Sequence, residues 1–534
     1  MPKTIFINSH KKFFFYLVLL IIIINIMTAY FSAGYYQADE QLHVLEFTNY
    51  KLGHNSIDNM PSEFFTKMRS WLLPGFYFIS YKIIHIFFST INQFTIATIF
   101  RIESSLFATF SEVLFIYSYY IATVKNFIDQ EDTSKRILKW KIVSSVISLF
   151  WLIPYLSART SAENFSNSFL LIIYSFFIFS NKNSFSFNSL SQKLILKNSY
   201  IFLLGIFLGI TFQIRYQTAF FMVGFYFWII FNAQQKIKFT LFLTLGFLLI
   251  ICLALYIDRW GYGIFTFTPL NYYIENIVHG EAASFGVEPW YTYIPFINDS
   301  IYPQFGILLF VLYFSAVIKY RKNLFIWCSL VFFVAHSLVG HKESRFLFPI
   351  LISMMIPSCE LFVDIFIHKK WCKIFQYPIT RVIIYTLIFL NFVEIARNTL
   401  RIPTKNMNSL EFLQKHLNNI HYYGFHSDIQ CNNSNESVGN YCGLKLSFYT
   451  VNHKEFLHLN SLAEFEEDLK KSNQPQYLYI GGRGINFLND VFYTKNCKIA
   501  YNSSIIPNWI FTEKHKWLSF LLKRTESSLF LTCH

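Results

Sequence analysis

The feature that most constrains this chain is a series of long apolar runs separated by short polar segments. The first run extends from about Phe13 to Tyr30, and a helix that crosses a bilayer needs about 20 such residues. Charged residues make up only 14% of the chain, whereas about 25% is usual in soluble domains. The period-two alternation typical of membrane β-barrels does not occur. The chain is therefore predicted to be a polytopic α-helical membrane protein. Further apolar runs lie at 141–157, 164–181, 199–214, 217–232, 238–257, 303–318, 324–340, 345–365 and 378–396.

The formal net charge of +14 comes from Lys and Arg residues that cluster between the apolar runs. Basic loops of membrane proteins normally face the cytoplasm. No phosphate-binding glycine loop, zinc-type cysteine pair or DNA-reading module accompanies them, so the charge indicates orientation. The first run has a basic flank at Lys11 and Lys12 and only a weak cleavage candidate at Ser32-Ala33-Gly34, so we expect a retained first span. The segments predicted to be cytoplasmic are the N-terminus, 125–141, 182–197, 236–238, 319–322 and 368–373.

Threading the runs alternately through the membrane predicts which segments lie on the outer, luminal or periplasmic, face. Between Trp71 and Val124 we expect two or three segments with Arg101 and Glu103 between them, and 11 to 13 spans in the whole chain. The predicted outer segments are the loop after Tyr30, 157–163, 215–218, 258–300, 341–345 and everything after about 398. We thus predict a multi-pass domain over 1–398, with large outer loops at 31–73 and 258–300, and an outer α/β domain over 399–534.

The first outer loop carries the acidic pair Asp39-Glu40, followed by Glu63 and Arg69. Carboxylates at the mouth of a membrane span are costly, and they often mark a site. The alternative is that the pair caps a helix or lies in bulk water. Aromatic residues between the charges suit short amphipathic helices in the membrane interface.

A second charged cluster, His341-Lys342-Glu343-Ser344-Arg345-Phe346, begins a later apolar run. If the cluster is helical, His341 and Arg345 share a face. Three potential cations suit a phosphate or pyrophosphate ligand. The alternative is a cap whose long side chains reach out of the membrane.

The second large outer loop is rich in aromatic residues between Thr268 and Tyr293, including Asn271 and Trp290. Such a loop fits either an interfacial aromatic belt or the stacking of sugars. Asp258-Arg259 at its start could form a simple ion pair. These residues, Arg215 and both charged clusters are all predicted to lie on one membrane face, and their convergence favours a functional site there.

The region after residue 399 is more polar and reads as a small α/β domain. Helices are predicted at 410–417 and 462–471, and strands at 444–451 and 476–480. Gly481-Gly482-Arg483-Gly484 lacks a following Lys-Ser/Thr pair, so we expect a turn rather than a phosphate loop. An outer location would permit disulfides, but the sequence leaves their pairing open. The cysteines of this region are Cys431, Cys442, Cys497 and Cys533.

These motifs together resemble glycosyltransferase family 22 of the GT-C superfamily, whose members use a lipid-phosphate mannose donor in GPI-anchor and N-glycan assembly. The resemblance spans about 37–350. The family's His-Pro-Asp-Glu motif appears as Gln37-Ala38-Asp39-Glu40, so the His-Pro pair is replaced, and the first Trp of its Trp-Glu-Trp motif is absent. Its His-Lys-Glu-x-Arg-Phe signature is intact at 341–346. Further family motifs are matched by Leu45-Glu46, Glu63-Phe64, Arg69-Ser70, Pro74, Pro269 to Asn271 and Phe285 to Tyr293.

The resemblance implies transfer of mannose from a polyprenyl- or dolichyl-phosphate donor to a hydroxyl of a glycolipid or glycan, with inversion to an α-linkage. It implies a catalytic base, for which Asp39 is the first choice and Glu40 the second. It also implies cationic side chains that bind the donor phosphate. It further implies that the reaction uses no metal or other cofactor. The candidate phosphate ligands are His341, Lys342, Arg345, Arg69 and Arg215, and the candidate acceptor or sugar ligands are Glu63, Asn271, Trp290, Tyr293 and Glu343.

Two other functions fit part of the sequence. A glycolipid transporter or flippase would share the spans and a polar chamber, but it would need neither the carboxylate pair nor a large outer domain. A GT-C transferase for a different sugar would share the machinery. The expected location is the ER membrane or a bacterial inner membrane, with membrane lipids as further partners and no nucleic acid.

Overall fold

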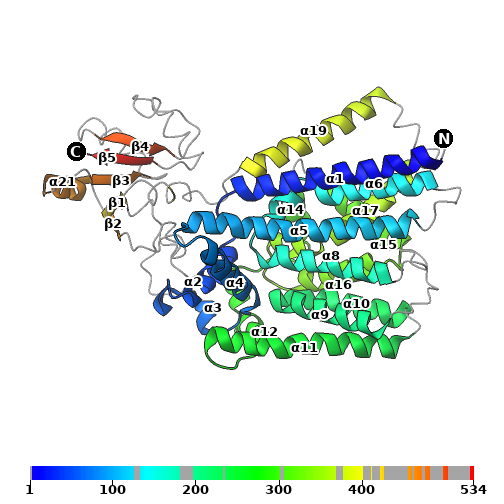
Figure 1. The fold of residues 1–534 in the computed structure, drawn as a ribbon, viewed down its shortest axis with the longest axis horizontal. Coiled ribbons are helices and arrows are strands. Elements are labelled where there is room, and N and C mark those ends of the chain that lie inside the picture. The colour runs from blue at the N-terminus through cyan, green and yellow to red at the C-terminus, as the bar shows by residue number, and fades with distance from the viewer. Residues whose placement is uncertain are drawn as a thin grey trace. The chain divides into compact units, whose positions relative to one another are not determined.

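The computed structural model shows a mainly helical chain whose helices follow the apolar runs (Figure 1). By contact the chain divides into two compact units, which are described separately. Unit 1 comprises 1–32, 66–76 and 99–401, and unit 2 comprises 33–65, 77–98 and 402–534. The structure describes residues 3–125, 133–180, 197–232, 235–300, 306–367, 377–400, 411, 421–425, 455–459, 462–471, 476–480, 497–502 and 529–533.

Five described helices are long and apolar enough to cross a membrane, and four shorter apolar helices accompany them. A helix satisfies its own backbone hydrogen bonds, which is why the apolar runs fold this way in lipid. The predicted total of 11 to 13 spans stays a prediction. The helices of unit 1 are α1 (Lys3–Phe31), α6 (Thr133–Leu149), α7 (Leu152–Ser157), α8 (Ala162–Ser180), α9 (Asn198–Ile214), α10 (Ala219–Asn232), α11 (Lys236–Tyr262), α12 (Thr268–Tyr273), α13 (Glu281–Ser284), α14 (Tyr293–Ser300), α15 (Gly306–Lys319), α16 (Leu324–Leu338), α17 (Phe348–Ile367) and α19 (Pro378–Leu400).

The region between Trp71 and Val124 contains two helices, α4 (Leu72–Phe87) and α5 (Gln93–Thr123), each shared between the units. The prediction that Arg101 and Glu103 separate two apolar segments is wrong, because both residues lie inside the continuous helix α5. Arg101 is buried there, and its Nε donates to the carbonyl of Ala29 at 2.9 Å. A carbonyl of a neighbouring helix therefore accepts a hydrogen bond from the buried charge, which lets Arg101 stay within α5.

Helices α9 and α11 approach each other at glycines. A Cβ atom added at Gly205 would lie 2.1 Å from the carbonyl oxygen of Leu243, and one at Gly246 would lie 2.1 Å from that of Phe202. Only a residue without a side chain fits such a contact, and small residues have this role in many membrane helix pairs. Figure 1 shows the two helices side by side over most of their length.

Aromatic side chains fill the interior of unit 1. The ring of Tyr174 on α8 lies 4.5 Å from that of Phe325 on α16 and 5.5 Å from that of Phe221 on α10. Edge-to-face aromatic pairs of this kind contribute about 0.5–1.5 kcal/mol beyond their buried area. These aromatic pairs stabilise the packing of α8 against α10 and α16.

Unit 2 includes the first loop and a five-stranded sheet. The loop contains the π-helical turn η1 (Glu40–Leu45), α2 (Glu46–Lys51), the 3-10 turn η2 (Ile57–Asn59) and α3 (Ser62–Phe65). The sheet order is β2-β1-β3-β5-β4, in which β2, β1 and β3 run parallel and β5 is antiparallel to both β3 and β4. The elements are β1 (His421–Phe425), β2 (Glu455–Leu459), α21 (Leu462–Lys471), β3 (Gln476–Ile480), β4 (Lys498–Asn502) and β5 (Leu529–Cys533).

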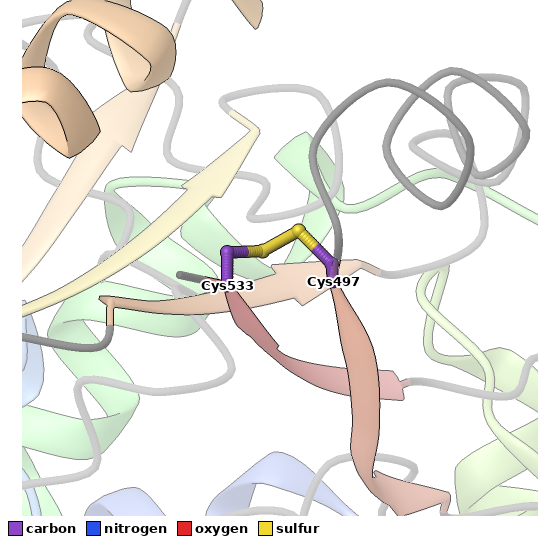
Figure 2. Close-up of a disulfide and its surroundings, with 2 residues drawn as sticks. All are labelled: Cys497 and Cys533. Atoms are coloured by element: carbon purple, nitrogen blue, oxygen red, sulfur yellow. A yellow bond between two sulfur atoms is a disulfide. The ribbon is translucent and has the colours of Figure 1, made fainter.

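Strand β3 coincides with the predicted strand at 476–480, and helix α21 coincides with the predicted helix at 462–471. The predictions for 444–451 and 481–484 lie outside the described residues, as does the helix predicted at 410–417 apart from residue 411. A disulfide joins Cys497, just before β4, to Cys533 at the end of β5 (Figure 2). The division of the chain at residue 398 stays a prediction.

Candidate active site

The two carboxylates of the acidic pair have different surroundings. Glu40 is buried, and its Oε1 accepts the backbone N–H groups of Tyr36 at 2.9 Å and Gln37 at 3.3 Å. These bonds tie the loop back onto the start of η1. Burial, and after it the carboxylates of Glu40 and Glu46, raise the pKa of the Tyr35 hydroxyl. Glu40 thus shapes the loop, and the neighbouring Asp39 is the more exposed carboxylate, with 28% of its side chain accessible.

His43 lies between two predicted site residues but is not itself among the predicted ones. Its Nδ1 is 3.7 Å from Oδ2 of Asp39, one helical turn earlier, and its Nε2 contacts the carboxylate of Glu63 on α3. The spacing of four residues between Asp39 and His43 was the available signal. Glu63 therefore holds the imidazole, whose Nδ1 faces Asp39 at ion-pair rather than hydrogen-bond distance.

Below this group, Glu46 supports the loop. It is buried, and its two oxygens accept hydrogen bonds from Nε2 of Gln41 at 2.7 Å and Nδ2 of Asn55 at 3.1 Å. The carboxylate of Glu46 thus ties η1, through Gln41, to the segment after α2, through Asn55.

The second charged cluster is not helical where the sequence analysis considered a helix. Glu343 has an extended backbone, with φ −133° and ψ 146°, and the 3-10 turn η6 (Ser344–Leu347) begins only after it. Glu343 nevertheless gathers its neighbours. Its carboxylate accepts Nε of Arg345 at 2.6 Å and Nη2 of Arg345 at 3.0 Å, and it lies 3.2 Å from Nε2 of His341.

A buried ion group lies behind this turn. Oε1 of Glu163 on α8 is 2.7 Å from Nη1 of Arg215 and 3.7 Å from Nη1 of Arg345. The three side chains are only 5–9% exposed. Both guanidinium groups also lie over the ring of Phe346, at 5.6 Å and 5.5 Å from its centroid. One carboxylate and one aromatic ring therefore hold two cations close together in a poorly solvated place.

Arg215 keeps donors that its neighbours do not use. Its Nε and Nη2 atoms are buried and have no hydrogen-bond partner among the described residues, and the same holds for the hydroxyl of Tyr293. Burial raises the pKa of that hydroxyl, while the Arg215 charge lowers it and Glu343 raises it. Because an unpaired buried donor costs about 1–3 kcal/mol, this arrangement favours an acceptor that arrives from outside the chain.

The ammonium of Lys342 is engaged by the backbone. It donates to the carbonyls of Glu288 at 2.9 Å, Gly340 at 3.4 Å and Val339. The backbone N–H of Glu288 donates in turn to the carbonyl of Gly340 at 2.9 Å. Burial lowers the pKa of this ammonium, and Glu288 acts in the opposite direction. Lys342 therefore joins the 286–289 segment to the charged cluster, and its predicted contact with a donor phosphate stays a prediction.

Asn271 contacts the segment just before Arg69, and Arg69 contacts the residue just after Asn271. Nδ2 of Asn271 lies 3.2 Å from the carbonyls of Thr66 and Lys67, and Lys67 has a positive φ of 54°. That conformation is unfavourable for a residue with a Cβ, so these bonds hold a strained turn. The guanidinium of Arg69 lies 5.5 Å from the ring centroid of Tyr272. In the same loop Trp290 is exposed, with 67% of its surface accessible.

Asp258 is a second residue whose importance the sequence reasoning missed. The expected ion pair with Arg259 is wrong: Arg259 instead lies over Phe265, 4.4 Å from its centroid. The buried Asp258 carboxylate accepts the backbone N–H of Trp71 at 2.8 Å, the Ser70 hydroxyl at 3.2 Å and the Thr268 hydroxyl at 2.8 Å. It connects α11, α12 and the segment after Arg69. No local sequence pattern predicts these contacts.

The structure thus brings His341, Arg345 and Arg215 around Phe346 in unit 1, with Glu343 bonded to Arg345 and close to His341. Tyr293 lies close enough to Arg215 and Glu343 for their charges to act on its hydroxyl. Asp39, Glu40, His43 and Glu63 lie in one loop of unit 2. Among the described residues no group of three or more His, Cys, Asp and Glu side chains could hold a metal ion. The absence of a metal from the reaction stays a prediction.

A family model described as the Alg9-like mannosyltransferase family matches residues 16–432, which is more than half of the chain. The chain belongs to this family. The predicted membership of family 22 is confirmed, and with it the prediction of an enzyme of the glycosyltransferase class, of the mannosyltransferase kind.

Individual relatives show the same likeness. GPI mannosyltransferase 3 of Debaryomyces hansenii is 24% identical over 521 residues, which cover 88% of this chain and 85% of that protein. GPI alpha-1,2-mannosyltransferase 3 of Mus musculus is 24% identical over 356 residues, covering 65% of this chain and 57% of that protein.

A crystal structure of ArnT from Cupriavidus metallidurans bound to undecaprenyl phosphate matches with a TM-score of 0.51 and 9% identity over 97% of each chain. This likeness shows the fold. The predicted polytopic helical membrane protein with the GT-C fold is confirmed.

Proposed function

We propose that this family member transfers mannose from a polyprenyl- or dolichyl-phosphate donor to a hydroxyl of a glycolipid or glycan, on the outer side of its membrane. The observation that carries the proposal is the buried Arg215, which has two unused donor nitrogens beside a second guanidinium. A phosphate ester offers the acceptor oxygens and the negative charge that such donors need.

The reaction would be a single displacement. The acceptor oxygen forms a bond to C1 of mannose, the bond from C1 to the phosphate oxygen breaks, and the lipid phosphate leaves with the electron pair. A β-linked donor would then give an α-linked product. Arg215 and Arg345 would offset the growing charge on the leaving phosphate, and electrostatic stabilisation of this kind is usually the largest single contribution to catalysis.

The proton of the acceptor hydroxyl would pass to the carboxylate of Asp39. Asp39 is preferred to Glu40 because Glu40 is buried and bonded to the backbone of its own loop, whereas Asp39 is partly exposed. His43 would orient Asp39, and Glu63 would hold His43. Trp290 presents an exposed ring on which a sugar can stack. Asn271, Glu343 and Tyr293 are proposed to help hold the sugar or the acceptor, while His341, Lys342 and Arg69 are proposed to help hold the phosphate.

The outer location is supported by the disulfide between Cys497 and Cys533. Disulfides form and persist in oxidising compartments such as the ER lumen or the periplasm. The relatives named above as GPI mannosyltransferases make a glycolipid acceptor the first one to test.

The test presents purified protein in bilayers with a set of defined polyprenyl-phosphate sugars and a mannosylated glycolipid acceptor. We expect consumption of the mannose donor alone. Asp39→Asn should lower kcat by about 10²–10⁴-fold, the usual contribution of a general base. Asp58→Asn, which changes an exposed carboxylate in η2 of the same loop, is the control and should keep full activity.

Two outcomes would contradict the proposal at different points. Full activity of Asp39→Asn would remove the base assignment but leave the transferase. If no lipid-phosphate sugar is consumed, while the same preparation moves a labelled glycolipid between leaflets, the chain is a transporter and the proposed reaction is wrong.

A further inference from the structure

A basic cluster lies at the end of α17 opposite to the charged turn η6. Asp364, near the C-terminal end of α17, is surrounded by three ammonium groups from two other helices. Its carboxylate is 2.9 Å from Nζ of Lys139 and 3.8 Å from Nζ of Lys135, both on α6, and 3.3 Å from Nζ of Lys319 on α15. Helices α6 and α15 both pack against α17, as Figure 1 shows.

The charges of this cluster do not balance. Asp364 faces three lysines and accepts the hydroxyl of Tyr320, and Glu360 faces one of the same lysines, Lys139, so two carboxylates stand against three ammonium groups. The next carboxylate along α17, Glu360, is buried and accepts the hydroxyl of Tyr119 at 2.7 Å. Lys135 lies beyond hydrogen-bond distance of Asp364, and 40% of its side chain is exposed. Lys319 lies 3.3 Å from Asp364, and 48% of its side chain is exposed.

The neighbouring loop adds further positive charge at a defined depth. Arg321 and Lys322, between α15 and α16, are exposed. The indole N–H groups of Trp327 and Trp228 donate to the carbonyls of these two residues, at 2.9 Å and 2.8 Å. Trp228 is buried in the core, but Trp327 is partly exposed. Exposed tryptophan indoles prefer the boundary between the hydrocarbon core and water, so we expect this loop and its cations at the depth of lipid headgroups.

The distance along α17 places this cluster on the other membrane face from Arg345. Helix α17 has 20 residues and is therefore about 30 Å long, close to the thickness of the hydrocarbon core. Basic side chains predominate on the cytoplasmic face, and pockets of basic residues between helices there bind the headgroups of anionic lipids.

We propose that the ends of α6, α15 and α17 form a binding site for the phosphate of an anionic phospholipid in the cytoplasmic leaflet. Asp364 holds the lysines in a convergent arrangement, and the exposed Lys135 and Lys319 take the headgroup phosphate between them. The bound lipid offsets the repulsion among the lysines and so stabilises the packing of α6 and α15 against α17. This site is independent of the proposed transfer reaction.

The experiment measures thermal unfolding of the full chain in phosphatidylcholine nanodiscs that contain increasing fractions of phosphatidylglycerol. The wild type should gain stability and then saturate. The double substitution Lys135→Gln with Lys319→Gln should raise the half-saturating fraction of phosphatidylglycerol about 30-fold, from about 1 kcal/mol for each basic side chain. Lys135→Arg with Lys319→Arg keeps both charges and should keep the wild-type response, which guards against a folding defect.

The matched control is Lys236→Gln with Lys238→Gln at the start of α11. It removes the same charge from the same predicted membrane face, at two lysines that form no ion pair with any described residue. It should leave the lipid response within twofold of the wild type. An equal loss in both double variants would overturn the proposal in favour of general surface attraction. Equal stabilisation by inorganic phosphate without phosphatidylglycerol would overturn it in favour of a soluble anion.

Discussion

Removing Glu163 should destabilise the protein more than removing its partner Arg215. Glu163 lies between two guanidinium groups, with Oε1 2.7 Å from Arg215 and 3.7 Å from Arg345. In Arg215→Met the carboxylate keeps Arg345 beside it. In Glu163→Gln, Arg345 keeps the carboxylate of Glu343, but Arg215 loses its carboxylate partner while a second guanidinium group stays beside the same Phe346 ring.

The distances set the size of the effect. At 2.7 Å and an effective dielectric constant of about 20, the attraction between unit charges is about 6 kcal/mol, and at 3.7 Å it is about 4.5 kcal/mol. The desolvation of each buried ion offsets much of this attraction, so loss of one partner typically costs about 3–5 kcal/mol. We expect Glu163→Gln near the upper end of that range and Arg215→Met near the lower end.

The assay is a double-mutant cycle on the free energy of unfolding, measured by denaturant titration of the purified protein in detergent micelles. The double variant should cost less than the sum of the single variants by about 2 kcal/mol or more, because no buried charge is left without its partner. Additive single effects would refute the reasoning, and so would a larger loss in Arg215→Met than in Glu163→Gln.

Three further predictions follow from other contacts. Lys342→Met should lower the free energy of unfolding by about 3 kcal/mol, roughly 1 kcal/mol for each of the three carbonyls that lose a hydrogen-bond donor. If the variant instead raises the KM for the lipid-phosphate sugar and leaves the free energy of unfolding unchanged, Lys342 binds the phosphate. Gly205→Val should lower the free energy of unfolding by at least about 1–3 kcal/mol, because the new Cβ would lie 2.1 Å from the carbonyl oxygen of Leu243. The midpoint of thermal unfolding should therefore fall, and an unchanged midpoint would contradict the prediction. The pKa of Tyr35 is raised above its unfolded value, so the unfolded chain loses this proton first and the free energy of unfolding should fall as the pH rises through about 10. In unfolding titrations at several pH values, Tyr35→Phe should remove the part of this alkaline loss that comes from Tyr35. An unaltered pH profile of Tyr35→Phe would refute this prediction.

The sequence predicts the helices of this protein well because a membrane helix is specified by its own composition. The apolar run at 199–214 corresponds to α9 at Asn198–Ile214, and the run at 378–396 corresponds to α19 at Pro378–Leu400. The misplaced break at Arg101 has the opposite cause. Its charge is accommodated by a carbonyl of α1, 72 positions away, and no pattern within α5 reveals that partner.

The same limit applies to the candidate site. The ionisable residues could be singled out locally, because charges beside apolar runs are unusual. Their individual environments could not, because those depend on contacts between distant segments. Asp258 receives its hydrogen bonds from Ser70 and Trp71, nearly 190 positions earlier, and Lys342 donates to Glu288, 54 positions earlier.

The glycine contact between α9 and α11 bears on how the protein is made. The two helices are separated in the chain by α10, so α9 leaves the insertion machinery before its closest neighbour has been synthesised. During that interval its glycine face must be covered by lipid or by an earlier helix, of which α8 is the adjacent one. A bulky residue at Gly205 or Gly246 would then leave each helix able to insert but would block their later association. Such variants would accumulate in the membrane as inserted, incompletely assembled chains, a defect of biogenesis rather than of catalysis.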